Sequence, residues 1–193
     1  MASLFDKLES EAFRKGLQVR SKEAQVWFQK KAKALGPIGR KILNDERLTQ
    51  KSDTKAGDMC MFIYDPKLKQ TLPYYDTFPL TIMVGPAPGG FYGINLHYLP
   101  PKIRAIFLDK LNDTASNQKF DRTTRFKITY KLLMATKKYK YFRPCFKHYL
   151  TKHVNSSIMK VNSAEWNIAI FLQTAQFKKA TVGSVWADSK KAY

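Results

Sequence analysis

Near the start of the chain, apolar residues recur at a spacing typical of helices. In residues 10–35 they stand among strong helix formers. The apolar positions are Phe13, Leu17, Val26, Trp27 and Phe28. We expect this helix to weaken at Gly16 and Ser21 and to end in the Gly/Pro-containing stretch 35–40. The polar residues 44–55 then predict a loop.

After residue 56 the pattern changes from helical spacing to short runs of β-favouring residues. Three such runs, 57–65, 79–84 and 91–99, predict strands. The Pro/Gly segment 85–90 cannot continue a helix and predicts the turn between the last two strands. Three strands with tight turns form a meander, which needs to pack against other elements to be stable.

Two aromatic clusters belong to this part of the chain. In the later cluster, alternation predicts a core face formed by Tyr92, Ile94, Leu96 and Tyr98. Asn95 and His97 then point to the other face, where we expect His97 to hydrogen-bond to a backbone group or a tyrosine and fix the sheet. In the earlier cluster, Tyr74 and Tyr75 are expected to pack at the mouth of the sheet, with Asp76 capping the turn or bonding a tyrosine hydroxyl.

The rest of the sequence is predicted to be mainly helical. Helices are expected at 100–113, at 121–142 with Asp121 as N-cap, at 143–154 after Pro144, and at 163–172 with Ser163 as N-cap. Residues 156–161 are typical of an extended edge. The tail, 182–193, is expected to be extended and anchored by Trp186.

These elements predict an α+β fold, in which a small β-meander or barrel-like sheet in the centre is flanked by N-terminal and C-terminal helices. We expect an N-terminal helical arm over residues 1–55 and a single α+β domain over residues 56–193. Within that domain, residues 56–100 form the β core and residues 101–193 are mainly helical and basic.

An excess of positive charge is the strongest global feature of the chain. It carries 34 Lys and Arg against 15 Asp and Glu, a formal net charge of +19. Residues 113–155 hold eleven basic and two acidic residues, whereas residues 56–112 have a net charge of only +1. Such an excess repels itself unless a polyanion or counterions neutralise it. Nucleic acid is the first candidate partner, ahead of an anionic membrane surface and an acidic protein.

In the basic segment, cations alternate with aromatic residues. Lys and Arg supply phosphate contacts, and exposed tyrosines can stack on unpaired bases; alternatively, these aromatics belong to the core. The predicted DNA contacts are Arg122, Arg125, Lys137, Lys138, Lys140, Arg143 and Lys147, with a second basic group at Lys30, Lys31 and Lys33, and the base-stacking candidates are Tyr139 and Tyr141. The sequence shows no helix-turn-helix spacing, zinc finger or heptad repeat, so we expect salt-dependent binding that is indifferent to base sequence.

The sequence lacks the motifs of the common catalytic and cofactor sites. There is no G-x-S-x-G elbow and no H-E-x-x-H pair, and residues 85–90 lack the Lys-Ser/Thr of a phosphate loop. Cys60 and Cys145 lie far apart and are expected to be buried thiols. We expect no cofactor, no metal, no small-molecule substrate and no enzymatic activity.

Membrane and export signals are also missing from the sequence. No run of about 18 apolar residues occurs, and the N-terminus has no apolar segment of signal-peptide type. We therefore expect no membrane partner and synthesis in the cytoplasm.

One block of sequence carries a family resemblance. It comprises "GDMCMFIYDPKLKQTLPYYDTFPLTIMV", then "GGFYGINLHYLPPKIRAIFLDKL", and continues in "FRPCFKHYL" and "SAEWNIAIFL". This block, within residues 57–186, resembles the DNA end protector proteins of T-even-like tailed bacteriophages; the N-terminal helix lies outside it. The resemblance implies a minor virion component that caps the packaged DNA termini against host exonuclease and takes part in completing the head. It carries over no specific DNA-contacting residue.

The expected partners are therefore double-stranded DNA termini and other phage head or neck proteins. The expected location is the virion, and the host cytoplasm during assembly and after DNA entry. Two alternatives remain open. One is a purely structural neck, portal-associated or baseplate protein that docks on acidic neighbours. The other is a metal-dependent nuclease built on the central aspartates Asp58, Asp65, Asp76 and Asp109.

Overall fold

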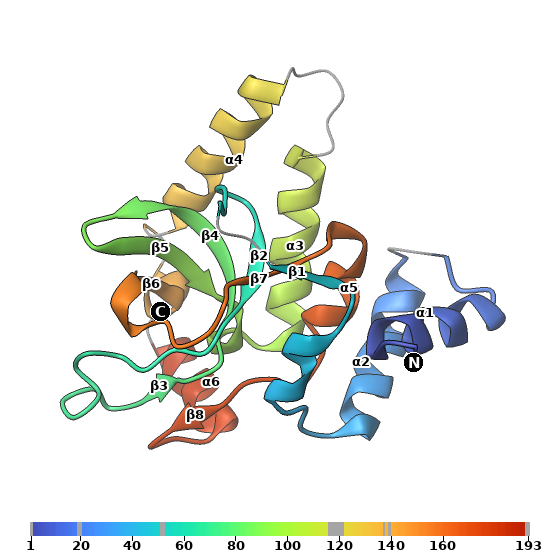
Figure 1. The fold of residues 1–193 in the computed structure, drawn as a ribbon. Coiled ribbons are helices and arrows are strands. Elements are labelled where there is room, and N and C mark those ends of the chain that lie inside the picture. The colour runs from blue at the N-terminus through green and yellow to red at the C-terminus, as the bar shows by residue number, and fades with distance from the viewer. Residues whose placement is uncertain are drawn as a thin grey trace.

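An antiparallel β-sheet lies at the centre of the fold (Figure 1). The computed structural model describes residues 2–18, 21–50, 53–115, 122–136, 138 and 140–191, without the side chains of 114, 115, 122–128, 140 and 141. In this part of the chain the main sheet has the strand order β1-β7-β2-β4-β5-β6. Its strands are β1 Leu48–Gln50, β2 Met59–Met61, β4 Leu80–Ala87, β5 Gly90–Asn95, β6 Phe146–Leu150 and β7 Met159–Val161. A separate small sheet pairs β3 Tyr75–Asp76 with β8 Phe177–Lys178.

Helices surround this sheet. They are α1 Leu4–Arg14, α2 Lys22–Leu35, α3 Pro101–Ala115, α4 Arg122–Thr136, α5 Trp166–Ala169 and α6 Val182–Lys191. Short 3-10 turns are η1 Arg40–Asn44, η2 Leu96–Tyr98, η3 Lys140–Cys145, η4 Thr151–His153 and η5 Ser163–Glu165. In Figure 1, α3 and α4 form an antiparallel pair that projects from the sheet, and α1 and α2 lie together at the N-terminal side. The predicted α+β class is confirmed.

The predicted weak points of the N-terminal helix divide it into α1 and α2. Gly16 follows α1 with a φ of +66°, which favours glycine, and the Ser21 side chain accepts a hydrogen bond from the Ala24 N–H to cap α2. Gly36, with φ +70°, ends α2 inside the predicted stop. Local capping chemistry therefore sets these helix boundaries, as the sequence predicts.

The predicted central strands pair as a meander, with β2 beside β4 and β4 beside β5. The β4–β5 turn is tighter than predicted, because β4 continues to Ala87 and β5 already begins at Gly90. Gly90 also lets β6 approach closely, since a Cβ at this position would stand 1.8 Å from the Tyr149 carbonyl oxygen. The described strands do not close into a barrel: β1 and β6 form the two ends of the sheet.

Part of the C-terminal half departs from the predicted secondary structure. Residues 143–154, predicted as a helix, instead contain the end of η3, the strand β6 and the turn η4. The β6 strand pairs with β5, opposing Tyr149 to Phe91, and this non-local pairing overrides the local helical pattern. Residues 44–55, predicted as a loop, contain β1, which pairs with β7.

Two segments are predicted to be extended, residues 156–161 and the tail 182–193, and the structure confirms only the first. Residues 156–161 do contain a strand, β7, but it lies between β1 and β2 and is not an edge. The tail is helical over α6, where Thr181 Oγ1 accepts from the Ser184 N–H as a cap. Trp186 does anchor it, because its Nε1–H donates to the His97 carbonyl at 2.9 Å.

Two hydrophobic clusters cover the sheet. The larger one joins the sheet to the helices and includes Phe5, Phe78, Leu80, Ile82, Ile94 and Leu108. The smaller one contains Cys60, Phe62, Tyr64, Met83, Phe91 and Tyr149. Its four aromatic rings pack edge-to-face in several pairs. Cys60 and Cys145 are buried thiols, as predicted, and burial raises the pKa of each to about 12.

The N-terminal helices are tied to the sheet by an ion-pair cluster at Arg47, which precedes β1. Its guanidinium pairs with Asp6 and Glu9 of α1 and, at 3.2 Å, with Glu165 of η5. The boundary at residues 55/56 stays a prediction, although β1 lies before it and pairs within the main sheet. In the described part of the chain, none of the helices has the length and apolar character needed to cross a membrane.

Candidate nucleic-acid interface

The predicted DNA-contacting residues of the basic segment fall in different settings. Lys138 and Arg143 are exposed, whereas Lys147 in β6 is partly buried. The remaining candidates lie wholly or partly outside the described residues: Lys137 and Tyr139 entirely, and the side chains of Arg122, Arg125, Lys140 and Tyr141. Of the predicted contacts in this segment, the structure therefore shows two exposed cations and one partly buried lysine.

The second basic group lies elsewhere. Lys30 and Lys33 are exposed on α2, and Lys31 pairs with Glu11 of α1 at 2.5 Å. In Figure 1, α2 lies on the opposite side of the sheet from β6. The structure does not bring this group onto the face that contains Lys147.

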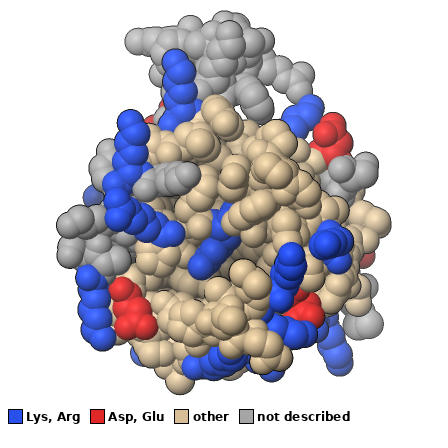
Figure 2. Space-filling view, turned by 90° about the vertical axis from the view of Figure 1, so that its left-hand side faces the viewer, with Lys and Arg blue, Asp and Glu red and all other residues tan. Residues whose placement is uncertain are grey.

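Many of the acidic side chains form ion pairs, and the excess of Lys and Arg over Asp and Glu leaves the net charge at +19. Besides the Arg47 cluster, ion pairs join Lys160 to Asp58, Lys69 to Asp65 and Lys191 to Asp188. Figure 2 shows the face that lies at the left of Figure 1: basic side chains stand around a mostly uncharged surface with a hollow near its centre, where a further basic side chain lies.

A pocket of about 330 Å³ opens among the elements of this part of the molecule. Its wall is unusually rich in aromatic rings, and we call it the tyrosine pocket. The residues that define it are Tyr64, Tyr74, Tyr75, Tyr98, Tyr149 and Lys147. Tyr98 and Tyr149 are buried, whereas Tyr74 and Tyr75 are partly exposed. The pocket therefore has a buried floor and an accessible aromatic wall.

Long-range contacts hold the outer wall in place. This wall is the loop that precedes β3, and Lys67 and Leu68 lie on it. The Lys179 ammonium, which follows β8, donates to the carbonyl oxygens of Lys69, Gln70 and Leu72 at 2.8–3.1 Å. A contact from the C-terminal part of the chain thus orders the rim of the pocket.

Lys147 is the charged group inside the tyrosine pocket. Its Nζ lies 4.0 Å from the centroid of the Tyr98 ring, a cation–π contact. Among the described residues, no carboxylate forms an ion pair with it. Burial lowers the pKa of Lys147 to about 8, so the ammonium is still mainly protonated at pH 7. Burial also raises the pKa of the Tyr98 hydroxyl, which stays neutral.

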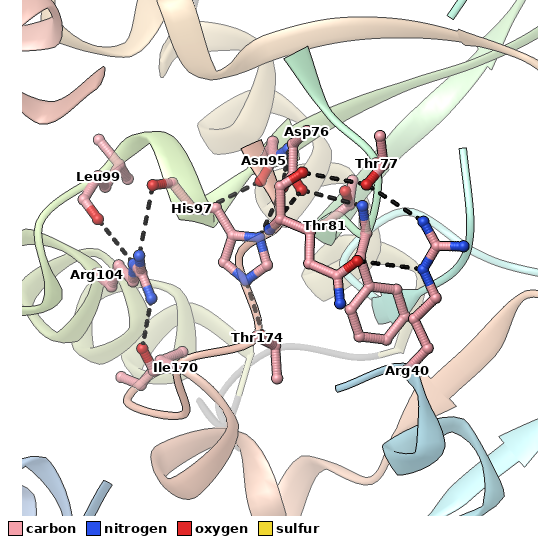
Figure 3. A network of polar contacts seen from close by, with 12 residues as sticks. Arg40, Asp76, Thr77, Thr81, Asn95, His97, Leu99, Arg104, Ile170 and Thr174 are labelled. Carbon is pink, nitrogen blue, oxygen red and sulfur yellow. Dashed lines mark hydrogen bonds and ion pairs between the residues drawn. The ribbon is translucent and has the colours of Figure 1, made fainter. Parts of the chain in front are cut away.

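Behind the pocket, Asp76, His97 and Thr174 form a buried chain of hydrogen bonds (Figure 3). Asp76 Oδ2 and His97 Nδ1 are 2.7 Å apart, and His97 Nε2 and Thr174 Oγ1 are 2.9 Å apart. Burial lowers the pKa of His97, so the imidazole is neutral, donating from Nδ1 and accepting at Nε2. Burial alone would raise the pKa of Asp76, but His97 and the other donors outweigh it and hold that pKa below its usual range.

This Asp–His–Thr arrangement has the order of a nucleophile–base–carboxylate triad, but its surroundings are those of a structural network. All three residues are at most 4% exposed, so the Thr174 hydroxyl faces no open site. Asp76 additionally accepts from the Phe78 and Gln176 backbone N–H groups at 3.0 and 3.2 Å. The network joins β3, η2 and the segment before β8.

The expectation for His97 was right in part: it stabilises the fold, but its side chain bonds to Asp76 and Thr174, not to a backbone group or a tyrosine. The prediction for Asp76 also holds in part, because it caps the turn at Phe78 while bonding His97 in place of a tyrosine hydroxyl.

A second buried cation, Arg104 of α3, extends the interior polar contacts shown in Figure 3. It donates to the carbonyl oxygens of Leu99 and Ile170 at 2.7 and 2.9 Å and to that of His97 at 3.4 Å. Burial lowers the pKa of Arg104 to about 10. These three bonds to backbone oxygens, made by a buried side chain, fix the position of η2.

The central aspartates do not converge. Asp58 pairs with Lys160, Asp65 with Lys69 and Asp76 with His97, while Asp109 accepts from the Gln25 side chain at 3.1 Å. No cluster of metal-ligating side chains occurs in the described part of the chain. The geometry gives no support to a nuclease site built on these residues.

The tyrosine pocket is not predicted from the sequence. Its signal is the aromatic density of residues 72–80, which the sequence pattern assigns to packing at the mouth of the sheet. The pocket depends on β6 being a strand. Alternate side chains of a strand share a face, so Lys147 and Tyr149 point to the same side and line the pocket with Tyr98 and Tyr74.

One comparison with known proteins gives a match. The family model described as Phage T4 terminal DNA protecting protein matches residues 6–190. No curated protein and no solved structure matches the chain. The matched range includes α1 and α2, so it extends beyond the block of residues 57–186 in which the resemblance was found.

Proposed function

Because this chain belongs to the family of phage T4 terminal DNA protecting proteins, we propose that it binds the ends of linear double-stranded DNA and protects them from exonuclease. The observation that carries this proposal is the extent of the match, residues 6–190, which takes in the sheet and the surrounding helices. The whole fold, and not a single module, is therefore the unit to which the family function applies.

The charge of the chain supports DNA as the ligand. A net charge of +19 favours a polyanion, and exposed Lys138 and Arg143 are available for phosphate contacts. Phosphate contacts carry no base information, so binding by such residues is indifferent to sequence and weakens steeply with salt. Recognition of an end then requires a feature that distinguishes a terminus from the interior of a duplex.

A competition experiment tests the proposal. Labelled linear duplex is bound at low salt and then challenged with unlabelled DNA of one sequence, either linear or as a closed circle. A protein that binds ends is displaced far more effectively by the linear form, in proportion to the number of ends. Equal displacement per base pair by both forms would show general coating of DNA and would reject end recognition.

We further propose that the protein travels with the packaged genome in the virion and takes part in completing the head. The resemblance to phage end-protecting proteins motivates this step. Mass spectrometry of purified particles before and after DNA ejection tests it: the protein should be present in full particles and leave with the DNA. Its absence from full particles would contradict this location without affecting DNA binding in solution.

A further inference from the structure

We propose that the tyrosine pocket receives the terminal nucleotide of a DNA strand, with its 5′-phosphate at Lys147 and its base against the tyrosines. This inference rests on the proposed function and supplies the feature that distinguishes an end from an internal site.

Lys147 supplies the positive charge of the pocket. Its side chain is partly buried, with the Tyr98 ring 4.0 Å from the ammonium and no ion-paired carboxylate among the described residues. A desolvated cation of this kind is costly unless an anion joins it. Asp76, the acidic residue on the pocket wall, acts on Lys147 only through its charge, which opposes the effect of burial on the lysine pKa. Both Asp76 oxygens accept from other groups, namely His97, Asn95, Phe78 and Gln176, and it forms no ion pair with the lysine. The ammonium is therefore left without a direct anionic contact from the described residues, and an external anion can supply one.

An aromatic wall stands beside this lysine. Tyr74 and Tyr75 are partly exposed and line the same pocket as Lys147. Tyr74 is held by Tyr98 and Phe177, with ring centroids 5.9 and 6.3 Å away. Aromatic rings fixed in this way provide a platform on which any base can stack, because every base has a π-face. An anion site beside such a platform matches the two parts of a nucleotide, its phosphate and its base.

The size and closure of the pocket suit a strand terminus. Its volume of about 330 Å³ lies at the lower end of small-molecule sites, roughly 300–1,000 Å³, and is too small for a duplex. Buried residues close its inner end, including Asn95 and Tyr149. A nucleotide within a continuous strand has backbone leaving on both sides, whereas a terminal nucleotide needs only one exit. A terminal base pair also opens more readily than an internal one, because it is stacked on one side only.

The 5′ end carries the better anion for a single lysine. A terminal phosphate monoester has a charge of about −1.5 to −2 at neutral pH, as a phosphorylated side chain does, compared with −1 for a backbone diester. Two further lysines add positive charge near the pocket. Lys67 lies on the pocket wall, and Lys178 lies opposite Tyr75 in the β3–β8 pair. This arrangement favours a 5′-phosphorylated terminus over a 5′-hydroxyl terminus.

The test uses hairpin DNA with one blunt end that carries either a 5′-phosphate or a 5′-hydroxyl. The full-length protein should bind the phosphorylated end about tenfold more tightly, since one charge-assisted contact contributes roughly 1.4 kcal/mol or more. Lys147→Met keeps an unbranched side chain only one atom shorter, removes the charge, and should make the two ends bind equally. Lys138→Met, a matched change at an exposed lysine, should weaken both ends alike and preserve their ratio.

A second variant covers the case in which Lys147→Met does not fold. Leu68 is 60% exposed on the rim, so Leu68→Glu places a negative charge at the mouth without disturbing the core. It should also reduce the preference for the phosphorylated end. An unchanged preference in the folded Lys147→Met or Leu68→Glu protein would overturn the pocket proposal.

The outcomes separate this inference from the proposed function. If the wild-type protein prefers linear over circular DNA but binds phosphate and hydroxyl ends equally, the pocket proposal fails and end binding stands. If linear and circular DNA bind equally, the proposed function itself fails. Chemical-shift changes at the pocket tyrosines on adding a 5′-phosphorylated thymidine dinucleotide, and weaker ones with the unphosphorylated dinucleotide, would support the pocket directly.

Discussion

Replacing Asp76 with Asn should destabilise the protein strongly, although the side chain barely changes in size. Asp76 is 4% exposed. Its Oδ1 accepts from the Phe78 and Gln176 N–H groups, and its Oδ2 accepts from Asn95 Nδ2 at 3.0 Å and His97 Nδ1 at 2.7 Å. An amide has only one acceptor oxygen, so two of these donors would face its NH₂ group.

The expected cost follows from what the network can rearrange. His97 can adopt its other tautomer and accept at Nδ1, because Thr174 Oγ1 can also accept from Nε2. Asn95 cannot turn its amide without losing the bond from the His97 N–H to its Oδ1. At least one buried donor is then unpaired, at about 1–3 kcal/mol, and the remaining bonds lose a charged acceptor. We expect a total loss of about 2–4 kcal/mol, a large share of a typical 5–15 kcal/mol.

Urea unfolding followed by tryptophan fluorescence measures this loss; Trp186 bonds the His97 carbonyl and reports on the network directly. Asp65→Asn is the matched control, because the Asp65–Lys69 pair is exposed and such pairs contribute about 0–1 kcal/mol. Equal, small losses in both variants would refute the structural role of the network. A stable Asp76→Asn protein that no longer protects DNA would instead show that the network acts in function.

Three further predictions concern other parts of the fold. In urea unfolding, Gly90→Ala should lower the free energy of unfolding by about 3 kcal/mol or more, because the new Cβ would collide with the β6 backbone. Gly39→Ala is the control: the space around Gly39 is open, so its free energy of unfolding should change by less than about 0.5 kcal/mol. Arg47→Ala should cost about 2–4 kcal/mol by leaving the buried carboxylate of η5 unpaired, and a loss below 1 kcal/mol would contradict that coupling. Burial, together with the positive charge of Arg104, outweighs the opposing effect of Asp76 and lowers the pKa of His97 in the fold. The unfolded chain therefore binds more protons below about pH 6.5, and stability should fall by up to about 1.4 kcal/mol per unit as the pH drops below that value. His97→Gln should remove this slope in unfolding curves at pH 5 and 7, and an unchanged slope would assign it to other groups.

Features set by neighbouring residues are the ones that the sequence predicts well. Caps and glycines place the break between α1 and α2, and alternating β-favouring residues place β4 and β5. These elements need only local propensity and a tight turn, which are visible within a few residues. The α+β class follows from them.

Features set by distant pairing could not be predicted. β6 pairs with β5 across about fifty residues of chain, and β1 pairs with β7 across more than a hundred. A lysine- and tyrosine-rich segment is compatible with a helix or a strand, and only its partner decides. The tyrosine pocket could not be predicted for the same reason. Composition predicts Lys147 as a surface contact, whereas the pairing of β6 with β5 places it, partly buried, in the pocket wall.

The contacts of His97 show the same limit. Its partners are Asp76 and Thr174, which lie 21 and 77 residues away in sequence. No spacing rule joins these positions, since each partner is brought to it by a different element. The sequence predicts structural roles for Asp76 and His97 separately, and the fold places the two side chains against each other in the interior.

The most direct test of the central claim is an exonuclease protection assay on one linear duplex. The DNA is incubated with the protein at low salt and then exposed either to a processive exonuclease that starts at ends or to a restriction enzyme that cuts near the middle. We expect the protein to block digestion from the ends at about two molecules or small multiples per duplex while the internal cut proceeds at its normal rate, with protection lost at high salt. Digestion from the ends at an undiminished rate, or protection that appears only when internal cutting is blocked equally, would contradict the account.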